Sequence, residues 1–201
     1  MAGPRREQFS DFVIATAFVV TAVFVLVPPA KALAGPVSND VGHPAIRASA
    51  FWPVILWCAG WPVAFARAGR AAGARALWAL GCLLSLLHTA VAFHVGHRWS
   101  HEAAWDHTRQ VGGFGDGIYV NYAFALVWLA DAVWVCAAFD SYRARPRWLH
   151  WLVHGFLAFV VFNAAVVFGS SGARWTFGCG LLVSLAARFA EARRPGTHVS
   201  R

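Results

Sequence analysis

Long apolar segments separated by short polar ones recur along the whole chain of 201 residues. A helix of about 20 mostly apolar residues is long enough to cross the hydrocarbon core of a bilayer. Because every backbone polar group must be satisfied within lipid, helices are the favoured spanning structure. Six segments fit this description: 12–27, 51–66, 76–94, 118–139, 149–168 and a shorter one at 175–187. The sequence therefore predicts an all-α integral membrane protein built as a polytopic bundle of six transmembrane helices.

The composition agrees with this class. Apolar residues make up 59% of the chain and charged residues 13%, unlike a soluble domain of this length. The four cysteines lie singly inside apolar segments, so we expect them to pack in the core and not to form disulfides. The formal charge is +8, but the basic residues lie in short clusters between apolar segments. We therefore expect a lipid bilayer and no nucleic acid as the partner of these charges.

The first apolar segment has a second interpretation. Residues 1–35 begin with basic residues, continue through an apolar stretch and reach Ala-Leu-Ala before Gly35, a pattern that is also typical of a cleaved signal peptide. We prefer an uncleaved anchor, because the apolar core 12–27 is long for a signal. Cleavage would leave five spans. With no repeat and no long linker in the sequence, residues 1–201 are predicted to form a single transmembrane domain.

The placement of arginine and lysine predicts the orientation of the spans. With a cytoplasmic N-terminus, twelve basic residues fall on the inner side and five on the outer side. The positive-inside rule then places both termini in the cytoplasm. The two longer connections, 30–50 and 95–117, fall on the outer face, and such loops often carry function.

One of these outer connections begins with a cluster of histidines. The stretch HVGHRWSHEAAWDH, residues 94–107, contains four of them, and the first three would share one helix face if the third span continues past the membrane surface. Imidazole nitrogens suit zinc or copper best, with iron as a further option. We therefore predict an outward-facing metal site formed by His94, His97, His101 and His107. Additional ligands or proton carriers on the same side of the membrane are His43, Glu102, Asp106 and Asp116.

Three roles remain open for this histidine cluster: metal binding, a structural hydrogen-bonded network, and a solvated surface. The leading hypothesis is a metal-dependent membrane enzyme that acts on a lipid or another apolar substrate, with the ion polarising water. The alternative is a non-enzymatic membrane subunit of a larger complex, whose polar outer loop docks a partner.

Ionisable residues inside spans form a second candidate site. Asp131 in the fourth span and His154 in the fifth both lie about 10 Å from the inner face at 1.5 Å per residue, so they are predicted to form an intramembrane polar pair. A hydrogen bond that fixes helix packing is the preferred role, and proton transfer or cofactor ligation is the alternative. A b-type haem would need His88 as its second axial ligand. Since His88 lies about 20 Å from the inner face, haem is not expected.

Overall fold

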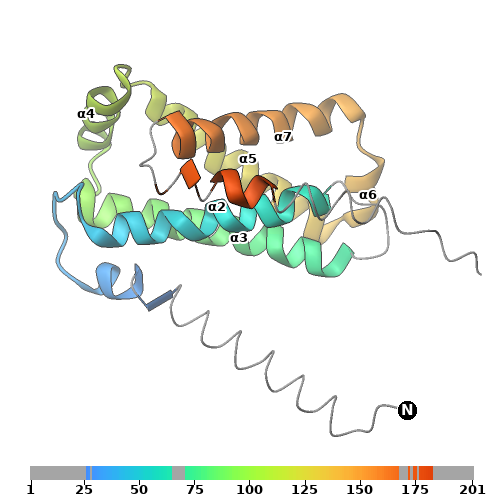
Figure 1. The fold of residues 1–201 in the computed structure, drawn as a ribbon, viewed down its shortest axis with the longest axis horizontal. Helices are drawn as coiled ribbons and strands as arrows, with labels where there is room; N and C mark the ends of the chain where they lie inside the picture. The colour runs from blue at the N-terminus through green and yellow to red at the C-terminus, as the bar shows by residue number, and fades with distance from the viewer. Residues whose placement is uncertain are drawn as a thin grey trace, which may run out of the picture.

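The computed structural model describes residues 26–27, 29–64, 71–167, 172, 174–175 and 177–182. Within these residues every regular element is a helix, as predicted (Figure 1). The elements in chain order are α2 (Pro44–Ala64), α3 (Ala71–Val91), the π-helical turn η1 (Ala92–Gly96), α4 (His101–Gly112), α5 (Gly117–Ala137), α6 (Phe139–Ala144), α7 (Arg147–Phe162) and the π-helical turn η2 (Asn163–Val167).

Three helical stretches in this part of the chain are long and apolar enough to cross a membrane. They are Arg75–Gly96, Gly117–Ala137 and Arg147–Val167, and they coincide with the predicted third, fourth and fifth spans. The predicted second span falls on α2, whose apolar part, Pro44–Ala59, is shorter. Of the predicted first span only residues 26–27 are described, and of the predicted sixth span residues 175 and 177–182.

The four longest helices lie side by side along one direction (Figure 1). Helix α2 packs on α3, α3 on α5, and α5 on α7. Helix α4 crosses one end of this bundle and α6 lies at the opposite end. We refer to these as the α4 end and the α6 end.

Tryptophans dominate the buried core between the helices. Trp57, Trp78 and Trp128 are each at most 2% exposed. The ring centroids of Trp78 and Trp128 lie 5.3 Å apart. A Cβ atom on Gly81 would lie 3.0 Å from the Trp128 ring, so this glycine lets α3 approach α5 closely.

The cysteines follow the prediction only in part. Cys58 and Cys82 are buried, as expected for packing residues, whereas Cys136 and Cys179 are exposed.

The helix of the third span does not continue through the histidine cluster, so the predicted continuous face was wrong. Helix α3 ends in η1 at Gly96, and the next residues leave the helix. Arg98 and Trp99 have φ values of 52° and 59°, in the left-handed region that breaks a right-handed helix. Ser100 then begins α4, its Oγ accepting a hydrogen bond from the backbone N–H of Ala103 at 3.1 Å. The four histidines are therefore divided between η1, a turn and a separate helix.

Candidate functional site

His94 connects η1 to the segment before α2. Its Nε2 lies 2.9 Å from the carbonyl oxygen of Gly35. The indole N–H of Trp99 donates to its Nδ1 at 3.2 Å. Since a carbonyl can only accept, Nε2 carries the proton and Nδ1 is the acceptor. Both nitrogens of His94 are therefore used in hydrogen bonds that hold the α4 end together.

His101 points instead toward two tyrosines of α5. Its Nδ1 lies 2.9 Å from the hydroxyl of Tyr122, and its Nε2 lies 3.4 Å from the hydroxyl of Tyr119. These contacts tie the first turn of α4 to the first turns of α5. His101 therefore has different hydrogen-bond partners from His94.

His97 and His107 are the two members of the cluster that lie against each other. Their ring centroids are 5.4 Å apart, at an interplanar angle of 44°. His97 is buried, and its Nδ1 has no hydrogen-bond partner within the described residues. Burial lowers the pKa of His97, and the nearby positive form of His107 lowers it further. Burial and His107 therefore both favour the neutral form of His97.

The additional predicted ligands also have separate environments. His43 Nδ1 accepts the backbone N–H of Ala45 at 3.2 Å. The carboxylate of Asp116 accepts the indole N–H of Trp105 at 2.9 Å. Asp106 lies 3.7 Å from Arg109 on the exposed side of α4, and Glu102 is also exposed.

The described part of the chain gives the predicted four-histidine metal site no support. It holds no group of three or more histidine, cysteine, aspartate or glutamate side chains that could bind one ion. The metal-dependent enzyme therefore stays a prediction. Within the predicted ligand set, the rings of His97 and His107 pack against each other.

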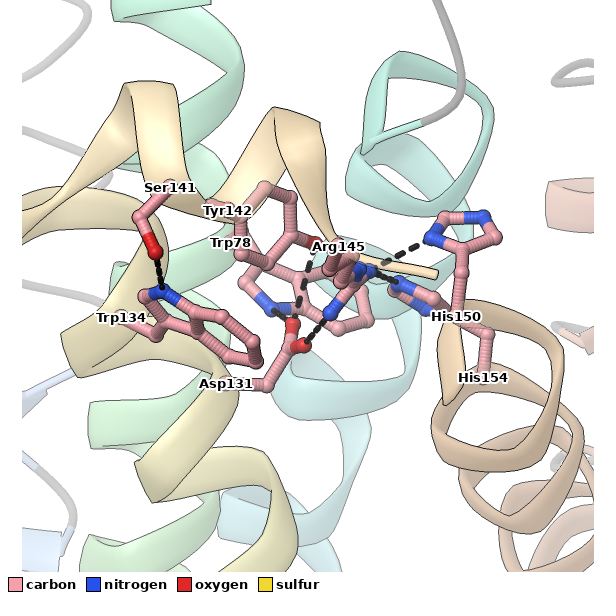
Figure 2. A network of polar contacts seen from close by, with 8 residues as sticks. All are labelled: Trp78, Asp131, Trp134, Ser141, Tyr142, Arg145, His150 and His154. Carbon is pink, nitrogen blue, oxygen red and sulfur yellow. Dashed lines mark hydrogen bonds and ion pairs between the residues drawn. The ribbon is translucent and has the colours of Figure 1, made fainter. Parts of the chain in front are cut away.

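A second polar cluster lies at the α6 end, and Figure 2 shows its side chains converging from four helices. At its centre Arg145, which follows α6, donates to Asp131 of α5 at 2.6 Å. The two side chains are each 2% exposed. The Asp131 carboxylate also accepts the indole N–H of Trp78 on α3 at 2.9 Å and the hydroxyl of Tyr142 on α6 at 3.2 Å.

Arg145 also joins this cluster to α7. One of its nitrogens lies 2.8 Å from the Tyr142 hydroxyl, 2.5 Å from His150 Nδ1 and 3.0 Å from His154 Nε2. Because arginine can only donate, the facing imidazole nitrogens must be unprotonated acceptors. Arg145 thus bridges Asp131 to His154, the predicted pair. We call Trp78, Asp131, Tyr142, Arg145, His150 and His154 the Arg145 network.

The charges within the Arg145 network balance. Three donors reach the Asp131 carboxylate, and one of them is the guanidinium of Arg145, which carries the opposite charge. Burial raises the pKa of the Tyr142 hydroxyl, and the negative charge of Asp131 raises it further. This geometry is suited to holding α3, α5, α6 and α7 together.

Sequence reasoning missed the centre of this network. By its place between two apolar segments, Arg145 is one of the twelve basic residues predicted on the inner side, where arginines usually contact solvent or lipid headgroups. A usable signal is Pro146, which forces the chain out of α6 and into the start of α7 within two residues. This tight connection leaves the Arg145 side chain between the helices.

In the described part of the chain, three helices have the length and apolar composition expected of a helical membrane protein. Comparison with known protein families, with curated proteins and with solved structures found no match to this chain.

Proposed function

We propose that this chain is a non-enzymatic membrane subunit that presents its α4 end to a partner protein on the outer face of the membrane. One observation carries the proposal: the polar side chains at this end form hydrogen bonds within the chain and so fix the shape of its surface. His94 binds the segment before α2, His101 binds α5, and Asp116 binds Trp105 of α4. We call residues 97–116 the outer cap.

Apolar side chains are exposed on the outer cap, at the two ends of its helix. Trp99 is 56% exposed, Val111 54% and Phe114 64%. Helix α4 itself is polar. Glu102 and Arg109 are exposed on it, and Asp106 is partly exposed. Exposed aromatic side chains of this kind are enriched in protein interfaces.

The charge distribution supports an outward orientation of the cap. The α6 end carries Arg143, Arg145 and Arg147 within five residues. In a multi-span membrane protein such a cluster favours the cytoplasmic side. Since α4 and α6 lie at opposite ends of the bundle, the outer cap then faces away from the cytoplasm (Figure 1).

The test is site-specific photo-crosslinking in native membranes. A photoreactive amino acid replaces Phe114 of the outer cap in one variant and Leu126 of α5 in another. The two side chains are similarly exposed, 64% and 67%, but Leu126 lies on an apolar span. We expect a discrete protein adduct from position 114 and lipid adducts from position 126. If position 114 yields the same lipid adducts as position 126, the cap rests on the bilayer and the docking proposal fails.

A further inference from the structure

His97 and His107 differ from His94 and His101, the other two members of the histidine cluster, because their rings lie against each other. We propose that they form a two-histidine site for one divalent transition-metal ion, zinc or copper, whose remaining coordination positions are filled by water or by a ligand from outside the chain. This proposal concerns metal binding alone and does not depend on whether the cap docks a partner.

The backbone between the two residues brings their rings together. His97 directly follows η1, and the left-handed residues Arg98 and Trp99 turn the chain before α4 begins. Helix α4 then carries His107 back beside His97, so that residues ten positions apart face each other. This pairing results from the turn and not from the i, i+4 spacing of His97 and His101, because these two residues are not on one helix.

The separation of the rings fits joint ligation of one ion. Zinc binds an imidazole nitrogen at about 2.0–2.1 Å, and with tetrahedral angles this puts two ligating rings roughly 5 Å apart between centroids. The observed centroid distance is 5.4 Å. The spacing of the two rings is therefore compatible with ligation of the same ion.

The surroundings of His97 also favour a ligand. Its side chain is 9% exposed, yet its buried Nδ1 has no hydrogen-bond partner among the residues that the structure describes. A buried polar atom without a partner is costly. A bound ion would give this nitrogen a partner.

Two neighbouring histidines act as internal controls. The nitrogens of His94 and His101 already lie within hydrogen-bond distance of Gly35, Trp99 and the two tyrosines. Ligation of the same ion by either ring would require these contacts to break. The proposal therefore predicts two protein ligands, and an affinity below that of sites with three or four.

The experiment uses the full chain in detergent, without a polyhistidine tag. Zinc binding is measured by calorimetry, and the copper(II) form is examined by electron paramagnetic resonance. We expect one ion per chain and a spectrum with two ligating imidazole nitrogens. His107→Gln and His97→Gln should each weaken binding by more than about tenfold. Loss of a residue that only hydrogen-bonds to a metal ligand already costs about this much, and these two residues are the ligands themselves. His101→Gln should leave the affinity unchanged.

Three outcomes would overturn the proposal: no stoichiometric binding by the unaltered chain, binding that survives both His97→Gln and His107→Gln, or equal loss in His101→Gln. His107 is only partly buried, so His107→Gln keeps the test valid if His97→Gln fails to fold. Failure of metal binding would leave the crosslinking result from position 114 unaffected, so the two proposals fail independently.

Discussion

The guanidinium of Arg145 lies 2.6 Å from the carboxylate of Asp131, with both side chains 2% exposed. Removing one member of a buried ion pair leaves the other charge without compensation. Asp131→Asn and Arg145→Met should each lower the free energy of unfolding by about 3–5 kcal/mol. Denaturant unfolding of the detergent-solubilised chain measures this loss.

The exposed pair Asp106 and Arg109 provides the matched control. Their side chains are 48% and 59% exposed and lie 3.7 Å apart. Solvent screening limits such a pair to about 0–1 kcal/mol, so Asp106→Asn should change stability little. Equal losses from Asp131→Asn and Asp106→Asn would show that burial of the Arg145 network does not matter.

The two buried charges should also be coupled. The double variant Asp131→Asn with Arg145→Met removes both the acceptor and the guanidinium, so its loss should be smaller than the sum of the single losses. A double-mutant cycle on the same unfolding curves gives the interaction energy. Strict additivity would mean that the two residues act independently.

The Tyr142 hydroxyl bridges both charged members of the network. It donates to Asp131 at 3.2 Å and accepts from Arg145 at 2.8 Å. Tyr142→Phe removes one hydrogen bond from each of these buried partners and should lower the free energy of unfolding by about 1–3 kcal/mol. Tyr119→Phe, which removes an exposed hydroxyl 3.4 Å from His101, should change the same unfolding curve by less than about 0.5 kcal/mol.

Gly115 leaves room for the ring of Trp105. A Cβ atom at this position would lie 2.2 Å from the indole, so Gly115→Ala must displace Trp105 and break its hydrogen bond to Asp116. We expect a loss of about 1–3 kcal/mol. Gly155→Ala in α7 is the control, because its Cβ meets nothing within 4 Å. If Gly115→Ala is as well tolerated as Gly155→Ala, the α4–α5 turn is not packed as described.

The outer cap should be sensitive to acid in metal-free buffer. Because burial and His107 lower the pKa of His97 in the folded state, the unfolded chain takes up a proton first as the pH falls. Stability should therefore be lost as the pH falls through about 6.5, the ordinary histidine value, and this loss should level off below the folded-state pKa. Unfolding midpoints between neutral and acidic pH should show a smaller acid loss for His97→Gln than for His101→Gln. An identical loss in both variants would contradict this assignment.

Much of the helical architecture could be predicted from the sequence. Hydropathy is averaged over about 20 residues, so the spans that contain Trp78, Asp131 and His154 are recognisable without tertiary information. The end of the third span was not predictable in this way. Arg98 and Trp99 adopt left-handed backbone, which residues other than glycine rarely do, so their identities give no signal of the break.

The polar clusters were predictable only in outline. Asp131 and His154 are noticeable because ionisable residues are rare in apolar segments. Arg145 is not, because its burial depends on how α6 folds against α5 and α7. The histidine spacing predicted four ligands on one site, whereas the turn before α4 sends His94 and His101 to different partners and pairs His97 with His107.

The orientation of the bundle is the most direct test of the account, since the outer cap must face away from the cytoplasm. Phe114→Cys in the outer cap and Asp140→Cys in α6 are made in chains whose four native cysteines are replaced by alanine. Intact cells are then treated with a membrane-impermeant thiol reagent. The account predicts labelling of Phe114→Cys in intact cells and of Asp140→Cys only after the membrane is permeabilised. Labelling of Asp140→Cys but not Phe114→Cys in intact cells would contradict it.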